Sequence, residues 1–299
     1  MGKNSEIENV IPSPLQRLHD PLWEDKNIQL WIKRDDLIHP VISGNKYRKL
    51  AFLHPLFRSG ACPGVISYGG PFSNHIHALA WLCKKYNVPL RAFIRSHREY
   101  LQSPTMEDVR EWGATIIPLS ARDYSKEVAQ ARTLKSKDQF PGQLIIPEGG
   151  SHPDALAGIG DMIDEIMTQL PAWDMIVCPV GTGATLAGIV RYKNHDQVAV
   201  GVSALKSSRT KEIMGLQWNL DQYRHWTIAD QWHFGGYGKI TGELSGFLEL
   251  FREKHGIKMD PLYNGKALYA FYQYVKFNLI PPGSKVVLVH TGGLQGART

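Results

Sequence analysis

Short apolar runs alternate with helix-length amphipathic segments along most of this 299-residue chain. That order is typical of βα units around a mostly parallel sheet, so it predicts the α/β class. We expect strands at 28–33, 64–68, 90–94, 115–119, 144–146, 175–180, 197–202 and 285–290. We expect helices at 46–58, 74–86, 105–112, 124–137, 153–170 and 185–192.

The βα units form two sets, one from about residue 50 to 146 and one from about residue 151 to the end. A chain of this length has room for two domains or one large α/β unit. The segment 206–237 contains Trp218, Trp226 and Trp232 but has weak periodicity, so we predict an irregular loop there. We interpret its tryptophans as packing residues.

Composition and charge narrow the class of protein. Three cysteines form no C-x-x-C pair, and their odd number argues against a disulfide framework, so we expect a cytoplasmic protein. The charged N-terminus predicts no export signal or lipid anchor, and we expect no membrane span. The net charge of +6 comes from basic residues interspersed with acidic ones. This pattern argues against a nucleic-acid partner and is equally explained by attraction of a small anionic ligand.

The strongest local motif joins the apolar run 175–180 to Gly181-Thr-Gly-Ala-Thr185 and a helical stretch. Glycine turns let backbone N–H groups form an anion nest, and the following helix adds the positive end of its dipole. A phosphate site is therefore one interpretation, and a ligand-free βα turn is the other. The motif is not a dinucleotide fingerprint, since Leu186 stands where its third glycine belongs, and it lacks the Lys-Ser/Thr of a Walker A loop.

Lys46 begins a predicted helix that also contains Arg48 and Lys49. Nearby positive charge and the positive helix end favour a neutral amine, which is the form able to attack an aldehyde. Taken alone, a solvated surface lysine is the simpler interpretation.

Ser73 and Asn74 follow a strand and a glycine turn at the start of another predicted helix. Ser73 is a good N-cap, and the free N–H groups of that helix would also bind a carboxylate. His75 and His77 are too close in sequence to share a metal on a helix, so we predict no metal site.

Two motifs lie near the C-terminus, Asp260-Pro-Leu-Tyr-Asn-Gly-Lys266 and Val286-Val-Leu-Val-His-Thr-Gly-Gly293. Thr291 follows a buried strand at the edge where α/β ligands bind, and its hydroxyl could meet a ring nitrogen. A strand-ending Thr before a glycine turn is the simpler alternative.

In this order the motifs resemble the pyridoxal-phosphate enzymes of the tryptophan-synthase-β type (fold type II), and specifically the 1-aminocyclopropane-1-carboxylate deaminase and D-cysteine desulfhydrase family. The resemblance extends from Lys33 to Gly293 and is carried by IKRDD (32–36), GNK (44–46), SNH (73–75), DPLY with GK (260–266) and HTGG (290–293). It implies two open twisted, mostly parallel sheets flanked by helices. It also implies a large cofactor-binding domain of residues 1–49 and 151–299, a small domain of residues 50–150, and a homodimer.

The resemblance implies pyridoxal 5'-phosphate as cofactor and gives its contacts. Lys46 would hold the cofactor aldehyde, Asn74 would hydrogen-bond the phenolic oxygen of the ring, and Thr291 would face the ring nitrogen. The phosphate would lie on the turn formed by Gly181, Thr182, Gly183, Ala184 and Thr185. Since a neutral hydroxyl does not hold a ring nitrogen protonated, Thr291 would leave the ring a weaker electron sink.

The implied catalytic residues are Lys46, Ser73, Tyr263 and Tyr237. Lys46 would remove the Cα proton of a small amino acid, and Ser73 would contact the substrate carboxylate or assist proton transfer. A leaving group on Cβ would then depart, and hydrolysis would give a 2-oxo acid and ammonia. D-cysteine is the leading substrate.

Departures from the family pattern keep alternatives open. Asn264 and Thr291 stand where cyclopropane-opening members carry Glu and Leu, and Phe72 stands in a turn that contains Gln in both branches. Ring opening of 1-aminocyclopropane-1-carboxylate is the alternative reaction. A non-catalytic pyridoxal-phosphate or amino-acid binding protein, and a phosphate-binding module that uses only the Gly181 turn, are alternatives of other classes.

Overall fold

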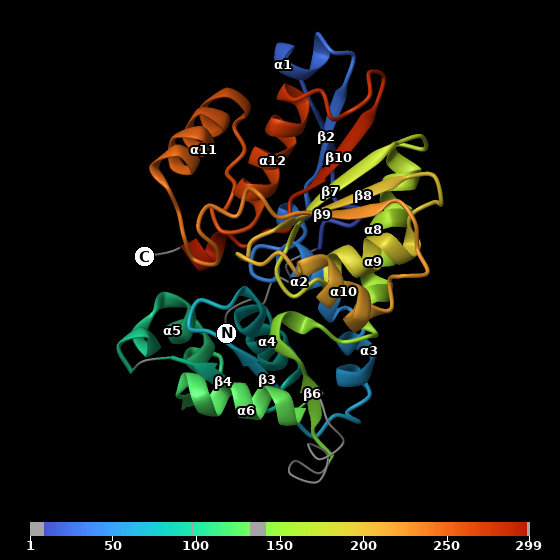
Figure 1. The fold of residues 1–299 in the computed structure, drawn as a ribbon. Coiled ribbons are helices and arrows are strands. Elements are labelled where there is room, and N and C mark those ends of the chain that lie inside the picture. The colour runs from blue at the N-terminus through green and yellow to red at the C-terminus, as the bar shows by residue number, and fades with distance from the viewer. Residues whose placement is uncertain (1–8, 97, 132–141, 298–299) are drawn as a thin grey trace, which may run out of the picture.

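A computed structural model describes residues 9–96, 98–131 and 142–297 (Figure 1). Its strands are β1 Leu15–Leu18, β2 Gln29–Lys33, β3 Val65–Gly69, β4 Leu90–Arg95, β5 Thr115–Leu119, β6 Leu144–Ile146, β7 Met175–Val180, β8 Val198–Ser203, β9 Trp226–Ala229 and β10 Lys285–Val289. Its α-helices are α1 Pro21–Glu24, α2 Asn45–Leu50, α3 Leu53–Arg58, α4 Asn74–Tyr86, α5 Pro104–Glu111, α6 Ala121–Ala131, α8 Ala155–Gln169, α9 Ala184–Tyr192, α10 Thr210–Trp218, α11 Gly242–His255 and α12 Asn264–Lys276.

The strands form two sheets. One has six strands in the order β1-β2-β10-β7-β8-β9, and the other has four in the order β5-β4-β3-β6. Every pairing is parallel except that of β1 with β2. Figure 1 shows the six-stranded sheet in the upper half, the four-stranded sheet in the lower half, and α2 and α4 between them. The predicted α/β class with two mostly parallel sheets is confirmed.

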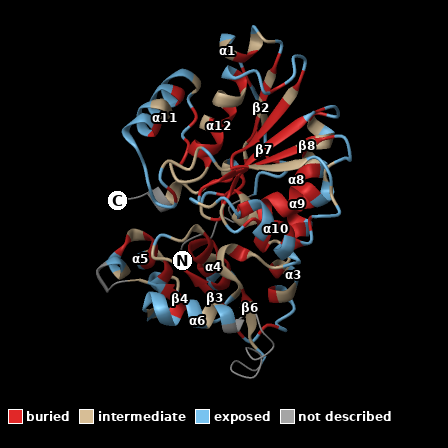
Figure 2. Cartoon of the chain, in the orientation of Figure 1, coloured by how far each residue is buried: buried red, intermediate tan, exposed pale blue. Residues whose placement is uncertain are grey.

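The central strand β7 shows how helices cover both faces of the larger sheet. All six of its residues are buried. Met175 and Val177 pack in the cluster that includes α12, whereas Ile176, Cys178 and Val180 pack in the cluster that includes α8 and α9. Because neighbouring side chains of a strand point to opposite faces, a strand covered on both sides is apolar throughout. Figure 2 shows this buried centre and the exposed outer faces of α6 and α11.

The two sheets draw on the segments that the domain prediction separates. Strands at 15–33 and 175–289 belong to the six-stranded sheet, and strands at 65–146 belong to the four-stranded sheet. The division into 1–49 with 151–299 and 50–150 stays a prediction, because strand membership does not fix where one domain ends.

The predicted helix 46–58 is two helices, α2 and α3, that meet at Ala51 and Phe52. Pro55 lies in the first turn of α3, where its missing N–H costs no hydrogen bond. In one continuous helix the same proline would remove the hydrogen bond to the carbonyl of Ala51. The first helix therefore ends at Leu50, and a second begins at Leu53.

The prediction of an irregular loop at 206–237 is wrong in part, because this segment contains α10 and β9. In α10, Met214 and Trp218 are buried while Ile213 and Leu216 are exposed, so apolar residues on both faces hide the helical period. The strand β9 is a four-residue edge strand, too short to show alternation. The tryptophans do pack: Trp218 is buried in the cluster that includes α8 and α9, Trp226 lies against that cluster, and Trp232 lies against the cluster that includes α12.

Other elements were not predicted, namely β1, α1, α11 and α12. The predicted helix 124–137 corresponds to α6, and its residues 132–137 lie outside the described part of the chain. The remaining predicted strands and helices are present within a few residues of their expected bounds.

Candidate active site

A cavity lies at the carboxyl ends of β7 and β10, neighbours in the six-stranded sheet, where it meets the turn between β3 and α4. The carboxyl edge of a parallel sheet is where α/β proteins bind ligands. Every residue that the sequence assigned to catalysis or to cofactor binding lines it: Lys46, Ser73, Asn74, Gly181, Thr182, Gly183, Ala184, Thr185, Tyr237, Tyr263 and Thr291. The structure thus brings these side chains together, and the role of each remains a prediction.

Lys46 is the second residue of α2. Its Nζ donates to Asn45 Oδ1 at 2.8 Å. Burial lowers the pKa of Lys46 to about 8, against the opposing effect of Asp260. The lysine is therefore more readily neutral than a surface lysine, in the direction that the sequence predicted.

The start of α2 is packed tightly against the turn after β10. Gly44 has φ +64°, and a Cβ added there would lie 1.9 Å from the carbonyl oxygen of Thr291. Only glycine allows this approach. The backbone N–H of Asn45 donates to the same carbonyl at 3.2 Å, so the chain before Lys46 is fixed relative to Thr291.

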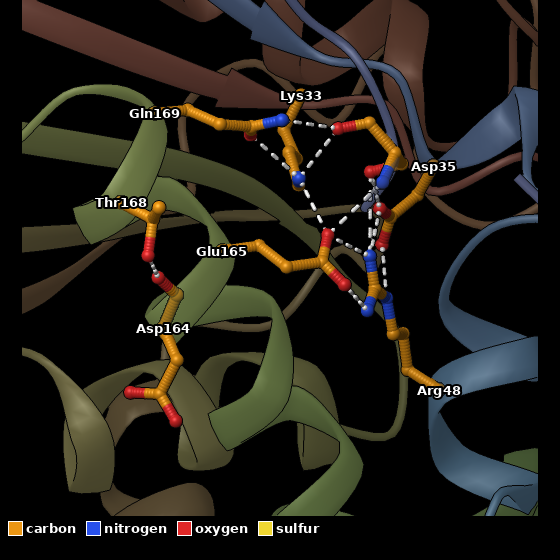
Figure 3. Close-up of polar contacts among 8 residues, drawn as sticks. Lys33, Asp35, Arg48, Asp164, Glu165, Thr168 and Gln169 are labelled. Atoms are coloured by element: carbon orange, nitrogen blue, oxygen red, sulfur yellow. Dashed lines mark hydrogen bonds and ion pairs between the residues drawn. The ribbon is translucent and has the colours of Figure 1, made fainter. Parts of the chain in front are cut away.

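Four charged side chains form a closed network beside α2, of which three are buried and Glu165 is partly buried (Figure 3). Arg48 Nη1 donates to Glu165 Oε1 at 2.6 Å, and its Nη2 donates to Asp35 Oδ1 at 2.8 Å. Lys33 Nζ donates to Glu165 Oε2 at 2.7 Å. Two positive and two negative charges cancel, so Arg48 does not supply the positive field on Lys46 that the sequence suggested. Instead the network joins α2 to β2 and α8 and so positions the helix that carries Lys46.

The turn between β7 and α9 presents hydrogen-bond donors. Gly183 caps α9 with φ +88°, and the first N–H groups of a helix have no partner within it. Thr185 Oγ1 accepts from Asn45 Nδ2 at 2.9 Å, and Thr182 Oγ1 accepts from Ser151 Oγ at 2.6 Å. Each threonine therefore keeps its own proton for donation to a ligand. The combination suits a phosphate group.

The N-terminus of α4 faces the same cavity. Ser73 Oγ accepts from the N–H of Ile76 at 3.2 Å, so the N-cap interpretation is confirmed and the hydroxyl proton remains available. The Asn74 Oδ1 atom is buried without a hydrogen-bond partner in the described structure. An unpaired buried acceptor is costly, and a hydrogen-bond donor on a ligand would relieve that cost.

Two tyrosines stand at the cavity, with ring centroids 6.1 Å apart. Burial raises the pKa of Tyr263 well above its ordinary value, and the neighbouring Tyr237 adds to this effect, so Tyr263 is a neutral phenol near pH 7. Tyr237 is 52% exposed and lies at the outer side. A Cβ on Gly181 would come within 3.1 Å of the Tyr263 ring, which places that ring against the β7–α9 turn.

Sequence reasoning missed Lys49 as a member of the site. Lys49 lines the cavity, and its Nζ donates to the carbonyl of Gly149. Burial, together with the charge of Lys46, lowers its pKa well below the ordinary value. Gly149 also packs against Thr182, so the Lys49 amine lies near the glycine turn. The i, i+3 spacing from Lys46 was the available signal, because it puts both lysines on one helix face.

His75 is a second residue whose place at the cavity was missed. Its Nε2 lies 2.8 Å from Ser67 Oγ, which itself donates to the carbonyl of Ile146, so Nε2 carries the proton. Its Nδ1 is buried without a hydrogen-bond partner in the described structure.

Within the described ranges, no three His, Cys, Asp or Glu side chains gather as metal ligands would. None of the described helices is both long and apolar enough to cross a bilayer.

The family model for pyridoxal-phosphate-dependent enzymes matches residues 7–292. The chain belongs to this family, and it is a pyridoxal-phosphate-dependent enzyme of the lyase and deaminase type. Solved structures agree: a crystal structure of an "ACC deaminase homologue" superposes with a TM-score of 0.78 at 28% identity, covering 98% of this chain and 94% of that one.

Two curated relatives differ in the reaction that their names give. The chain is 29% identical to the Arabidopsis thaliana bifunctional D-cysteine desulfhydrase/1-aminocyclopropane-1-carboxylate deaminase, over 96% of this chain and 77% of the plant protein. It is 25% identical to the Yersinia pestis D-cysteine desulfhydrase, over 96% of this chain and 92% of the bacterial protein. The family therefore defines the cofactor, whereas the names of these two relatives do not agree on a single substrate.

The cavity fits the cofactor that the family uses. The Lys46 amine suits an aldehyde, the β7–α9 turn suits a phosphate, and the unpaired Asn74 Oδ1 suits a ring hydroxyl that donates to it. Lys46 is on α2, and the glycine turn joins β7 to α9. Because both line one cavity, they would hold the two ends of one small molecule.

Proposed function

We propose that this enzyme catalyses β-elimination from D-cysteine, giving pyruvate, sulfide and ammonia. The observation that carries the proposal is the meeting of a lysine with a lowered pKa, Lys46, and two helix N-termini, those of α4 and α9, at one cavity. Two helix N-termini provide for two anionic groups, a phosphate and a substrate carboxylate. An amino-acid substrate would supply the carboxylate.

The cofactor, when bound, withdraws electrons from the Cα atom of the amino acid that it holds. Lys46 Nζ then acts as the base that takes the Cα proton, a task favoured by a pKa of about 8. Ser73 Oγ and the first N–H groups of α4 orient the substrate carboxylate. The neutral Tyr263 hydroxyl keeps its proton and is suited to donate a hydrogen bond to the leaving sulfur.

The choice of D-cysteine over cyclopropane ring opening is supported by Asn264. This residue is buried, and its side chain is fully engaged with Asp260, Thr291 and Gly292. It therefore offers no carboxylate where the ring-opening members carry Glu. Loss of sulfide from Cβ requires only the Cα base and a donor near the leaving group.

The test is release of 2-oxo acid by the cofactor-loaded enzyme offered D-cysteine, L-cysteine and 1-aminocyclopropane-1-carboxylate in parallel. We expect equal amounts of pyruvate, sulfide and ammonia from D-cysteine, with one water consumed. The Lys46→Ala variant is the matched control and should release none. 2-Oxobutanoate from the cyclopropane substrate alone would replace our proposal by the ring-opening reaction, and silence on all three substrates would overturn it.

We also propose that the enzyme is a homodimer, as the family resemblance implies. Light scattering coupled to size-exclusion chromatography tests this directly, and a mass of one chain would contradict it.

A further inference from the structure

The side chain of Asn264 has its orientation fixed by its partners. One end lies 2.8 Å from the backbone N of Thr291, a group that can only donate, so that end is the amide oxygen. The other end lies 2.7 Å from the carbonyl oxygen of Gly292 and also contacts the Asp260 carboxylate, groups that accept. That end is therefore the NH₂ group.

This orientation determines where the Thr291 hydroxyl proton goes. Thr291 Oγ1 lies 3.0 Å from the same Asn264 oxygen, which can only accept, so the hydroxyl donates to Asn264. A threonine hydroxyl has one proton and two lone pairs. With the proton engaged, Thr291 presents only lone pairs to any further partner. If the proton turned away, two oxygen atoms would face each other at 3.0 Å without a hydrogen between them.

Asp260 holds this arrangement in place. Its Oδ1 accepts from the N–H groups of Leu262 at 3.0 Å and Tyr263 at 2.8 Å, and its Oδ2 accepts from the backbone N–H of Asn264 at 3.0 Å. The carboxylate thus caps the start of α12 and accepts from the Asn264 NH₂ group as well. Because all these groups are buried or nearly so, little water competes for them.

We propose that Asn264 is a positioning residue that makes Thr291 a hydrogen-bond acceptor toward the cofactor ring, so that the ring nitrogen is held protonated. This inference rests on the proposed function, in which Thr291 faces that nitrogen. It reverses the sequence expectation that a neutral hydroxyl leaves the nitrogen unprotonated. The chain from Asp260 through Asn264 to Thr291 then gives the ring the stronger electron sink without a carboxylate in direct contact.

The test is the ¹⁵N signal of pyridoxal phosphate, labelled at the ring nitrogen and bound to the protein at pH 8. Free labelled cofactor in acid and in alkali supplies the protonated and neutral reference positions. We expect the wild type and Thr291→Ser at the protonated position. Thr291→Val, which lacks the acceptor, and Asn264→Ala, which frees the hydroxyl proton to donate to the ring, should move to the neutral position.

Each outcome decides the matter, provided that signals are compared at equal cofactor occupancy. A neutral ring in the wild type, or a protonated ring in both Thr291→Val and Asn264→Ala, overturns the inference. A merely structural role for Asn264 would lower occupancy or stability without moving the signal of the protein that remains loaded. Absence of bound cofactor from the wild type would instead refute the proposed function, and the inference with it.

Discussion

Lys46 and Lys49 lie three residues apart on α2 and line the same cavity, yet their amines have different partners: Asn45 for Lys46 and the carbonyl of Gly149 for Lys49. Because Gly149 packs against Thr182, we assign Lys49 to the phosphate end and Lys46 to the aldehyde end. Borohydride reduction of the loaded enzyme followed by peptide mapping should place the pyridoxyl group on Lys46. Lys49→Met should keep that label and weaken cofactor binding about tenfold, or about 1.4 kcal/mol. A label on Lys49 would contradict the assignment.

The lowered pKa of Lys46 predicts how cofactor attachment depends on pH. Only the neutral amine attacks an aldehyde, so the rate of attachment should rise with pH until about pH 8 and then level off. An ordinary lysine, with a pKa near 10.4, would continue to gain up to about that pH. Stopped-flow absorbance of apoprotein mixed with pyridoxal phosphate measures the rate, and N-acetyl-lysine under the same conditions is the control. A protein profile that keeps rising with the model amine would show that burial does not tune Lys46.

The sequence was most informative where local chemistry alone decides the structure. The β7 run is apolar at every position, and Gly183 in the turn that follows it has φ +88°, a backbone conformation that glycine adopts readily. Ser73 is a local cap for α4 and was recognised as one. These features depend on contacts within a few residues, so they can be predicted from spacing and residue type.

The features that could not be predicted from the sequence depend on contacts between distant segments. Arg48 meets Glu165 across 117 positions, and Thr291 meets Asn264 across 27, so neither partner is visible from local pattern. The hydrogen bond from the Thr291 hydroxyl to Asn264 could not be predicted either, because its acceptor lies on another element. The helix α10 was missed for a different reason, since exposed Ile213 and Leu216 mask its period.

Gly44→Ala should disrupt the site, because the added methyl group would collide with the Thr291 carbonyl and the residue would keep a positive φ. We expect loss of cofactor binding along with a lower unfolding midpoint. Gly246→Ala is the matched control: this glycine lies within α11, and a Cβ added there would have no atom of the described structure outside its own helix backbone and chain neighbours within 4 Å. That substitution should stabilise the protein by about 0.5–1 kcal/mol and leave binding unchanged. Normal cofactor affinity in Gly44→Ala would show that the contact with Thr291 does not position Lys46.

The charge network predicts a large cost for removing one of its members. Glu165→Gln leaves the buried Lys33 and Arg48 cations with Asp35 as their remaining acidic partner in the network. Breaking a buried ion pair typically costs about 3–5 kcal/mol, and urea unfolding at pH 7 measures that loss. The exposed pair Arg209–Glu212 supplies the control, since Glu212→Gln should not change the unfolding midpoint measurably.

The pH dependence of that cost follows from the direction of the Glu165 pKa. Burial alone would raise this pKa, but hydrogen bonds from Arg48 and Lys33 lower it below its ordinary value. A carboxyl whose pKa is lower in the folded state stabilises the protein above its unfolded pKa, and that stabilisation is lost as pH falls through the folded pKa. The difference in unfolding free energy between wild type and Glu165→Gln should therefore be constant from pH 7 to about 5 and shrink in more acidic solution. A difference that persists unchanged at acid pH would mean that packing around Glu165, and not its charge, holds α2 in place.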